Sequence, residues 1–328
     1  MSKEKILSIS VAAYNIEKLI TDNLNSFINS EVNDLIEIIV TDDGSTDNTS
    51  NIVEEYVKKY PETIRLIKQP NMGAGSTVNS GLRHATGKYF KMIDGDDWVD
   101  TSVLNKIVKE LKEIDVDMVI TNYDLFDEKN KKIIKTNKIN IEPNKILEFS
   151  TFCRNTKLEM HNVMYKTNIL KENNIVLDNG FYTDVEYLLL PVNKIKKCIF
   201  FDNSLYIYRI ARAGQSVSLE SMQKHIDMHD LVLKRLINYY ETNKKYLNEE
   251  TKEYITNRLG GMADTQLMVI LSFGNNRDSV KKFFKEIEEL SIDIYKKFIR
   301  GKKEKILLYS NFLLINTTTQ IIRRKFRS

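Results

Sequence analysis

The chain has few of the residues and segments on which several protein classes depend. Only two cysteines, Cys153 and Cys198, occur among its 328 residues, so neither a disulfide framework nor a cysteine-based zinc site is expected. No run of about 18 apolar residues is present, and a transmembrane helix is therefore not expected. The first residues lack the apolar core and the small-residue cleavage site of a signal peptide. These absences predict a cytoplasmic protein.

What is present indicates a globular protein with unevenly placed charge. Hydrophobic residues make up 42% of the chain, charged residues 29%, and the net charge is +4. From Ile294 onward, however, ten Lys and Arg residues accompany a single acid, Glu304, and they flank the apolar stretch 306–315. Such a basic amphipathic tail suits an anionic membrane surface, although an ordinary packed helix explains it equally well. No nucleic-acid-binding motif accompanies the charge, so nucleic acid is not an expected partner.

Strand and helix patterns alternate over the first 125 residues. The predicted strands are 6–13, 36–40, 63–68, 89–93 and 117–123. The predicted helices between them are 17–30, 48–60, 74–85 and 102–112. This alternation predicts right-handed crossovers and a mostly parallel α/β sheet.

The later part of the chain has a different character. Residues 129–144 are rich in Lys and Asn and predict an exposed hairpin or loop, and amphipathic helices are predicted over 222–240, 249–272 and 278–298. We expect a first domain over 1–220, with halves of about 1–125 and 126–220. A helical region with the basic tail would occupy 221–328.

The most informative cluster is Asp94-Gly95-Asp96-Asp97, directly after the predicted strand 89–93. Crowded carboxylates repel one another unless a cation or donor neutralises them. Mg²⁺ and Mn²⁺ prefer oxygen ligands and complete their shells with substrate phosphates. A solvated turn is the alternative. A calcium loop is excluded, because its sixth and twelfth positions would be Val99 and Asn105 instead of Gly and Glu.

Polar residues also end two other predicted strands, as Tyr14-Asn15 and Asp42-Asp43. Ligands of parallel sheets bind at the carboxyl ends of the strands. The three clusters are therefore expected to meet at one edge of the sheet and to form one site.

Three stretches, 8–15, 38–49 and 81–89, together resemble the motifs of family 2 glycosyltransferases, and Asp94 to Asp97 matches that family's Asp-x-Asp-type signature. The resemblance extends over roughly residues 6–218. It implies the GT-A fold, a Rossmann-like and mostly parallel sheet flanked by helices, here with a C-terminal helical extension. It also implies an inverting enzyme that uses a nucleoside-diphosphate sugar, typically a UDP-sugar, with Mn²⁺ or Mg²⁺.

The resemblance also implies roles for individual residues. Asp43 would accept a hydrogen bond from the base, although turn formation is the alternative. The implied donor-binding residues are Ala12, Tyr14, Asn15, Asp43, Asn79, Asp94, Asp96, Arg209 and Arg212, and the implied metal ligands are Asp96 and Asp97. Arg209 or Arg212 would close over the pyrophosphate as a charge clamp. Gly73-Ala74-Gly75 would approach the donor or be a plain loop; as a dinucleotide fingerprint it is incomplete, because Val78 takes the third glycine position.

The second half must supply the general base of an inverting transfer. Asp184 aligns with the family's catalytic Asp, although Thr183 stands where the family usually has Glu. Capping of a helix that begins at Val185 is the alternative role of Asp184. Glu186 is a second candidate on the acceptor side. His161 would contact the acceptor or a phosphate, or would be a structural histidine.

The expected acceptor is a glycan or a lipid-linked glycan in cell-surface polysaccharide synthesis, which would place the protein on the inner face of the cell membrane. A non-catalytic donor-binding subunit is one alternative. A sugar nucleotidyltransferase is less favoured, because Tyr14 to Glu17 lacks the glycine-rich basic loop that it needs. The resemblance selects no donor sugar, linkage or metal, and it allows a homo-oligomer.

Overall fold

Two units make up the chain, Met1–Ala213 and Gly214–Ser328. The computed structural model describes residues 4–28, 30–180, 182–210, 219–274, 277–317 and 319–320. The division between the units falls in the segment 211–218, outside the described residues and close to the boundary predicted near residue 220.

The first unit is built around one sheet. Its strands are β1 (Leu7–Ala13), β2 (Ile36–Asp42), β3 (Ile64–Lys68), β4 (Tyr89–Asp94), β5 (Trp98–Val99), β6 (Met118–Asp127), β7 (Lys132–Asn137), β8 (Ile146–Glu148), β9 (Val163–Lys166) and β10 (Lys197–Ile210). Its helices are α1 (Ile20–Ile28), α2 (Thr49–Lys59), α3 (Ala74–His84), α4 (Thr101–Leu111), α5 (Phe149–Phe152), α6 (Thr167–Glu172) and α7 (Thr183–Leu189).

The sheet joins two parallel halves through one antiparallel strand. The strand order is β3-β2-β1-β4-β9-β6-β10-β5, with β7 beside β6 and β8 beside β10. Strands β1 to β4 pair in parallel, and so do β6 and β10. Between them, β9 pairs antiparallel with both β4 and β6. The predicted α/β fold with a parallel-dominated sheet is confirmed, and β9 is the element that the alternating pattern does not reveal.

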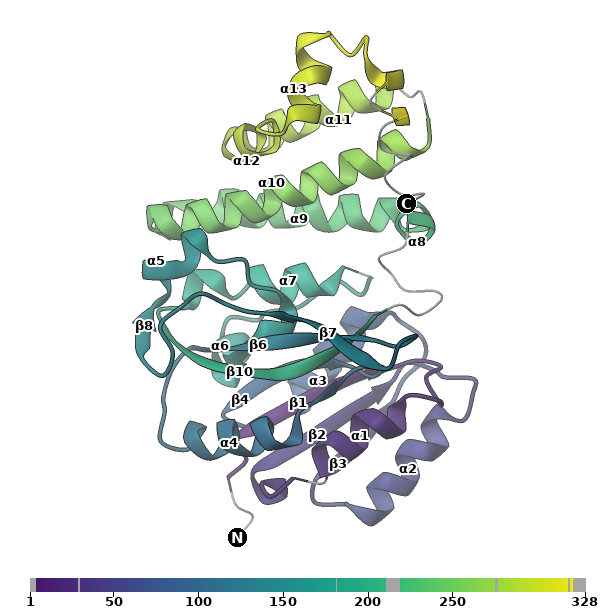
Figure 1. The fold of residues 1–328 in the computed structure, drawn as a ribbon, viewed down its shortest axis with the longest axis vertical. Coiled ribbons are helices and arrows are strands. Elements are labelled where there is room, and N and C mark those ends of the chain that lie inside the picture. Colours follow the sequence, from purple (N-terminus) through teal and green to yellow (C-terminus); the bar gives the residue numbers. More distant parts are fainter. Residues whose placement is uncertain are drawn as a thin grey trace. The chain divides into compact units, whose positions relative to one another are not determined.

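Helices cover both faces of this sheet, with α1, α2 and α4 on the nearer face in Figure 1 and α3 behind it. The strands are accordingly buried: every residue of β2 is buried, and β1 and β4 each have one partly exposed residue. Strands buried on both faces need continuous apolar runs, which explains the sequences of β1 and β2. Because the strands are buried, a ligand can reach polar side chains mainly at the strand ends.

Glu37 connects β1 and β2 with the segment 86–87 near the amino-terminal ends of these strands. This nearly buried carboxylate accepts hydrogen bonds from the hydroxyl of Ser8 and from the backbone N–H groups of Thr86 and Gly87. The stretch 81–89 thus serves the packing of the sheet at the end opposite to the strand ends that carry Asp42 and Asp94.

The second unit is helical, as predicted. Its helices are α8 (Leu219–Lys224), α9 (Ile226–Asn243), α10 (Glu249–Ser272), α11 (Arg277–Leu290), α12 (Ile292–Phe298) and α13 (Lys302–Tyr309). Its core includes Leu233 of α9, Leu259 of α10 and Phe283 of α11, all buried. None of the described helices has the length and apolar composition needed to cross a membrane.

Candidate metal and donor site

The register of the parallel strands brings three strand ends to one edge. Ala12 pairs with Asp94 of β4, and Ala13 pairs with Asp42 of β2. The backbone N–H of Asp43 donates to the carbonyl of Ala13 at 2.9 Å. The convergence predicted from the sequence is confirmed, and the polar residues at these strand ends can contribute to one site.

Asp94, Asp97 and His161 form a group whose ligand atoms all lie within 4.8 Å of one another. Asp94 ends β4, Asp97 precedes β5, and His161 lies in the 3₁₀ turn before β9. Gly95 allows this turn to press against β1, because its N–H donates to the carbonyl of Ala12 at 3.0 Å. A Cβ at Gly95 would lie 2.5 Å from that same oxygen, so a larger residue would force the turn away.

Asp97 is held in place by β10. Asp97 is buried, and its carboxylate accepts hydrogen bonds from the hydroxyl of Tyr206 at 2.6 Å and from the backbone N–H of Arg209 at 2.8 Å. Burial and then the neighbouring Asp94 carboxylate raise the pKa of Asp97 well above its usual range, against the lowering effect of those two donors. A nearby cation would favour the ionised form of both carboxylates. Two carboxylates and an imidazole are also a donor set that can bind a divalent cation, and the carboxylate oxygens suit Mn²⁺ or Mg²⁺.

Three tyrosine rings surround His161. Tyr208 stacks on the imidazole at 4.5 Å between centroids, Tyr206 meets it edge-on at 4.6 Å, and Tyr123 lies at 4.8 Å. Burial and then the charge of Lys91 lower the pKa of His161 to about 3. Its Nδ1 is buried and has no hydrogen-bond partner in the described part of the chain. A neutral imidazole with an unsatisfied nitrogen beside two carboxylates fits a metal ligand.

Lys91 is a fully buried lysine in β4 that the sequence analysis did not single out. Its ammonium group donates to the carbonyl oxygens of His161 at 3.0 Å and Val163 at 3.3 Å. Burial lowers the pKa of Lys91 to about 7. These bonds fix the turn that carries His161. The one signal in the sequence is a lone lysine inside the apolar run 89–93.

Tyr208 connects this group with the second half of the unit. Burial, and then the charges of Asp97, Asp94 and Asp184 in that order, raise the pKa of Tyr208 to about 12. Coulombic effects of this kind require charges nearby. The charges of all three carboxylates therefore act on this phenol, whose ring stacks on His161. Tyr208 belongs to the site, although the sequence predicted a role only for its neighbour Arg209.

Asp184 lies in the first turn of α7 and is partly exposed. The helix begins at Thr183 with Tyr182 as its N-cap residue, so the alternative that Asp184 caps a helix starting at Val185 is wrong. Besides its effect on Tyr208, the Asp184 charge contributes, after burial, to a raised pKa of Tyr182. The charge of Asp184 therefore acts on two phenols, those of Tyr208 and Tyr182.

Glu186 has a structural position instead of the predicted acceptor-side one. It is fully buried, and its carboxylate accepts the backbone N–H of Asp178. Asp178 in turn accepts the N–H of Gly180 at 2.9 Å. Glu186 therefore braces the loop before α7 and is not open to an acceptor.

The segment Gly73-Ala74-Gly75 packs against that same loop. A Cβ at Gly73 would lie 1.9 Å from the carbonyl oxygen of Asn179, and one at Gly75 would lie 1.6 Å from that of Asp178. The two glycines are thus required for close backbone approach. Asn79 contributes in a similar way, because its amide exchanges two hydrogen bonds of 2.9 Å with the backbone of Leu177. Asn79 thus braces the loop, and its predicted contact with the donor stays a prediction.

Asp43 shapes the loop that follows β3. It is almost fully buried, and it accepts hydrogen bonds from Gln69 Nε2 at 2.7 Å, from Met72 N at 2.9 Å and from Gly73 N at 2.8 Å. Both carboxylate oxygens are therefore engaged within the protein. A nucleobase bound here would therefore contact the loop that Asp43 orders, because the Asp43 carboxylate already accepts hydrogen bonds from that loop.

Tyr14 and Asn15 occupy the end of β1. The Tyr14 side chain is 49% exposed and offers an open aromatic face. Asn15 has a left-handed backbone conformation (φ 52°), donates its N–H to Ser45 Oγ at 3.0 Å and accepts the N–H of Thr46 at 2.8 Å. Asn15 therefore ties the ends of β1 and β2 together, and Tyr14 is left as the group open to a ligand.

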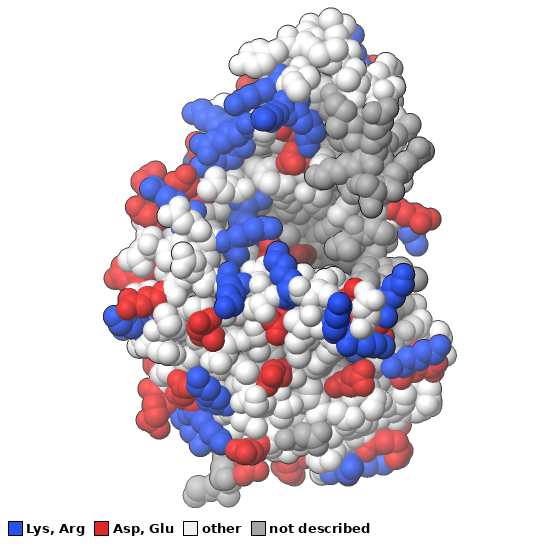
Figure 2. All heavy atoms as spheres, in the orientation of Figure 1, with Lys and Arg blue, Asp and Glu red and all other residues white. Residues whose placement is uncertain are grey.

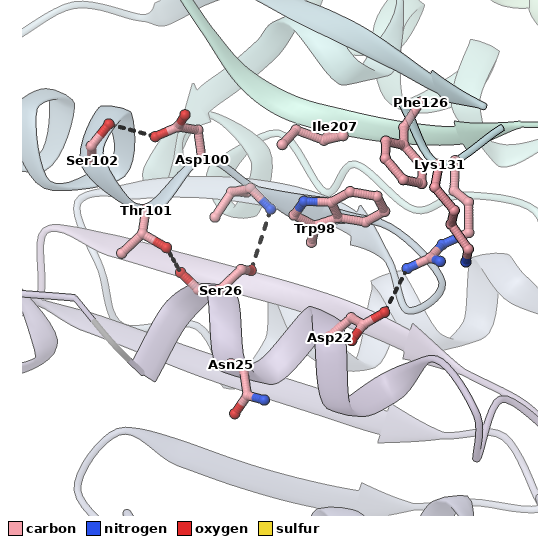
Figure 3. Close-up of a pocket in the computed structure, with 12 residues that line it drawn as sticks. Asp22, Asn25, Ser26, Trp98, Asp100, Thr101, Ser102, Phe126, Lys131 and Ile207 are labelled. Carbon is pink, nitrogen blue, oxygen red and sulfur yellow. Dashed lines mark hydrogen bonds and ion pairs between the residues drawn. The ribbon is translucent and has the colours of Figure 1, made fainter. Parts of the chain in front are cut away.

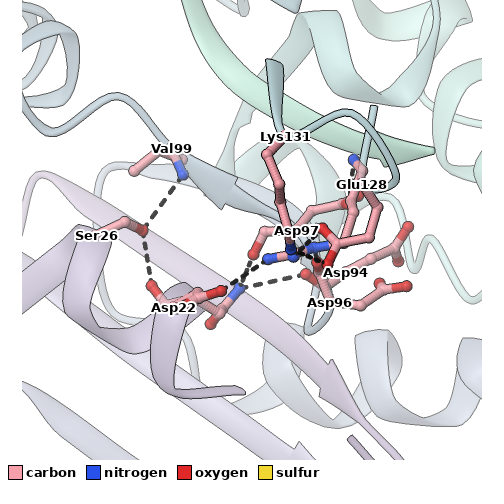
Figure 4. A network of polar contacts seen from close by, with 10 residues as sticks. Asp22, Ser26, Asp94, Asp96, Asp97, Val99, Glu128 and Lys131 are labelled. Carbon is pink, nitrogen blue, oxygen red and sulfur yellow. Dashed lines mark hydrogen bonds and ion pairs between the residues drawn. The ribbon is translucent and has the colours of Figure 1, made fainter. Parts of the chain in front are cut away.

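Arg209 is the centre of a network of polar contacts (Figure 4). Only 3% of its side chain is exposed. Its guanidinium donates to the carbonyl of Asp96 at 2.8 Å, to Glu128 at 2.6 Å and to Asp22 at 3.0 Å, and it lies 4.5 Å from the centroid of the Trp98 ring. Arg209 thus holds the turn that presents Asp97, and its predicted clamp on a pyrophosphate stays a prediction.

The two remaining predictions have different outcomes. The Asp96 side chain is not part of the group formed by Asp94, Asp97 and His161. Of the two predicted metal ligands, only Asp97 belongs to it. Arg212 lies outside the described residues.

An open pocket of about 680 Å³ lies beside the Arg209 network (Figure 3). Trp98, Phe126, Ile207 and Arg209 line it together with polar side chains such as Asp22. Its described lining includes none of the three residues of the metal group. The pocket is therefore separate from the group, although Trp98 and Arg209 connect the two.

Comparisons with known proteins agree on one family. A model of glycosyl transferase family 2 matches residues 8–173. The chain is 26% identical over 212 residues to EpsJ of Bacillus subtilis, an uncharacterised glycosyltransferase, and this alignment covers 62% of the chain and 61% of EpsJ. It is 27% identical over 222 residues to the minor teichoic acid biosynthesis protein GgaB of the same species, covering 64% of the chain and 23% of GgaB. The chain thus matches less than two thirds of the length of either relative.

A solved structure shares the fold. The chain superimposes on residues 1–349 of S. aureus TarS in complex with UDP-GlcNAc with a TM-score of 0.66 and 18% identity, covering 98% of this chain and 91% of that one. At this identity the likeness shows a common fold, which agrees with the fold that the motif resemblance implied.

Proposed function

Because the chain belongs to glycosyl transferase family 2, we propose that it transfers a sugar from a nucleoside diphosphate to a hydroxyl group of a glycan or lipid-linked glycan. The observation that carries the proposal is the placement of Asp94, Asp97 and His161 at one edge of the sheet, where the charge of Asp184 acts on Tyr208, whose ring stacks on His161. A metal group and a candidate base at one site are what such a transfer needs.

Asp94, Asp97 and His161 would hold Mn²⁺ or Mg²⁺. Two observations support the fit: burial and then the Asp94 charge raise the pKa of Asp97, and Nδ1 of His161 has no hydrogen-bond partner among the described residues. A bound cation would offset the negative charge that develops on a departing diphosphate. Around it, Tyr206 and the backbone of Arg209 orient Asp97, and Lys91 orients the turn of His161.

Asp184 would act as the general base. A carboxylate that accepts the proton of an acceptor hydroxyl lets its oxygen attack the anomeric carbon while the diphosphate leaves from the opposite side, which inverts the configuration. Such a base contributes about 10²–10⁴-fold in rate. The partial exposure of Asp184 leaves it open to an acceptor, whereas Glu186 is enclosed.

We place a uridine nucleotide at the ends of β1 and β2. The exposed ring of Tyr14 would stack on the base, while Asp43 orders the loop 69–73 beside it. The fold neighbour TarS, whose structure contains UDP-GlcNAc, supports the choice of uridine. The similarity to a teichoic acid biosynthesis protein supports an acceptor among cell-surface polymers.

The first experiment is the thermal midpoint of the chain with UDP, with and without Mn²⁺, with ADP and NAD as controls. A ligand at about 100 times its dissociation constant stabilises the fold by roughly 2.7 kcal/mol. We expect a shift with UDP that depends on Mn²⁺ and no comparable shift with the controls. A shift with a different nucleotide would change the donor. No shift with any nucleotide would favour a chain without transfer activity.

Asp184→Asn separates binding from transfer. It should keep the shift produced by UDP and Mn²⁺ and lose transfer from a UDP-sugar. Asp227→Asn is a matched control, because Asp227 is an exposed aspartate in the first turn of another helix, α9. Transfer that persists unchanged in Asp184→Asn would remove this residue from the mechanism.

A further inference from the structure

Four large apolar side chains are left exposed on α13 and the turn that follows it. The exposed fractions are 47% for Ile306, 89% for Tyr309, 70% for Leu313 and 47% for Leu314. Single exposed apolar residues are ordinary on protein surfaces, but several within nine consecutive residues mark an interaction surface. A partner that removes them from water would therefore be favoured.

This segment is anchored, so the exposure is not the result of a detached tail. Leu307, Phe312 and Ile315 alternate with the exposed residues and are buried. The ring of Phe312 packs edge-on against Phe284 of α11, with 5.2 Å between centroids. The guanidinium of Arg277 donates to the carbonyl of Asn311 at 2.8 Å. The fold thus presents the apolar side chains outward from a packed base.

Basic side chains accompany the apolar ones. Lys302, Lys305, Ile306 and Tyr309 are all exposed, and their spacing of three, four and seven residues puts them on one face of α13. Figure 2 shows Lys and Arg side chains gathered over α12 and α13. The one acid between Ile294 and Gln320 is Glu304, which is 1% exposed and paired with Lys303. The exposed face therefore carries charge of a single sign.

We propose that this face docks on an anionic membrane surface. The apolar side chains would enter the boundary between headgroups and acyl chains, and Lys302 and Lys305 would meet lipid phosphates. We call Ile306, Tyr309, Leu313, Leu314, Lys302 and Lys305 the α13 face. A second copy of the chain is a poorer occupant, because a symmetric contact would bring these lysines together.

The proposal deepens the proposed function, and its meaning for catalysis rests on that function. A lipid-linked acceptor is confined to the membrane surface, so an enzyme held there meets it at a high local concentration. Membrane binding itself needs no transfer activity. The two proposals can therefore fail separately.

The test is co-sedimentation of the full chain with two kinds of vesicle. One kind contains phosphatidylcholine alone, and the other also contains about 30% phosphatidylglycerol, which gives the vesicle a negative surface potential. We expect binding to the anionic vesicles, weakened by salt, and at least about tenfold weaker binding to the neutral ones. The variant Tyr309→Ser/Leu313→Ser should lower the anionic binding by about tenfold or more. Lys302→Glu/Lys305→Glu should lower it by a similar factor and remove the salt dependence.

The matched control is Tyr246→Ser/Phe273→Ser, which removes two exposed apolar side chains of the same unit outside the α13 face; these are 75% and 55% exposed. It should bind vesicles like the unchanged chain. All variants should keep the thermal shift with UDP and Mn²⁺, which separates loss of docking from loss of the donor site. Equal binding to both kinds of vesicle, or anionic binding unaffected by Tyr309→Ser/Leu313→Ser, would overturn the proposal. So would a dimer in sedimentation velocity that this variant abolishes.

Discussion

The hydroxyl of Tyr206 donates a hydrogen bond of 2.6 Å to Oδ2 of Asp97. Because Tyr206 lies in β10 and Asp97 precedes β5, this bond connects the two halves of the first unit at its candidate metal group. The antiparallel pairing of Val99 with Tyr206 sets the position of the phenol. The geometry of Asp97 therefore depends on a strand that the chain forms about a hundred residues later.

Tyr206→Phe tests this dependence. The change keeps the ring against His161 and removes the donor, so a buried carboxylate loses one of its partners. We expect Mn²⁺ affinity in the presence of UDP to fall about 10–100-fold, the usual cost of losing a partner of a metal ligand. Titration calorimetry measures it. Tyr89→Phe removes another buried hydroxyl, which bonds the carbonyl of Ile114, and should leave Mn²⁺ affinity unchanged.

His161→Ala tests whether the imidazole belongs to the metal group. It should remove most of the additional stabilisation that Mn²⁺ gives to the UDP complex, with Mn²⁺ affinity lowered by at least about tenfold. Whatever smaller shift in thermal midpoint UDP gives without Mn²⁺ should be the same in this variant and in the unchanged chain. His84→Ala, an exposed histidine of α3, is the control. If His161→Ala bound Mn²⁺ as well as the unchanged chain, the histidine would be structural and Asp94 and Asp97 would have to find another third ligand.

Local patterns explain why the regular elements of the first half could be predicted. The predicted strand 36–40 falls within β2, and the predicted helix 74–85 matches α3 within one residue. Both depend on apolar periodicity within a few turns or strand residues. By contrast, β9 has four residues and pairs with strands distant in sequence, so no local pattern marks it.

The same reason limits the prediction of the site. Asp94 and Asp97 come from one motif of four consecutive residues, which predicted a metal role for Asp97 and donor binding for Asp94. His161 joins them because β9 lies beside β4, which the sequence does not reveal. Arg209 carries a charge that suggests a ligand, but in the fold Asp22 and Glu128 neutralise it. Charge is readable from the sequence, and its partners are not.

Tyr208→Phe should affect transfer more than donor binding. The ring would keep its stacking on His161, while the hydroxyl on which the charges of Asp97, Asp94 and Asp184 act would be lost. We expect kcat to fall by about tenfold, the value of a hydrogen bond of roughly 1–1.5 kcal/mol, with the UDP shift unchanged. Tyr123→Phe is the control, because Tyr123 also lies against His161 but its hydroxyl bonds Asn137. Equal losses in both variants would assign the effect to packing around the imidazole.

Because the pKa of Glu304 is raised in the folded chain, we expect the packing of α13 on its unit to lose stability as the pH rises. This carboxyl is 1% exposed, and burial together with a hydrogen bond to Asp264 raises its pKa to about 7, although Lys303 opposes the shift. A carboxyl whose pKa is higher in the folded than in the unfolded chain binds its proton more strongly when folded. Its contribution to stability is therefore complete below its usual pKa and is lost as the pH rises through about 7.

Amide exchange of α13 at pH 5 and pH 8, corrected for the intrinsic rates, measures this effect. In the unchanged chain we expect protection to be lower at pH 8. Glu304→Gln keeps a hydrogen-bonding side chain without the charge, so it should raise protection at pH 8 by about 1–3 kcal/mol and change little at pH 5. Glu289→Gln alters an exposed carboxylate of α11 and serves as the control. If Glu304→Gln shifted protection equally at both pH values, the ionisation of Glu304 would not control α13, and the buried contact with Asp264 would act through packing alone.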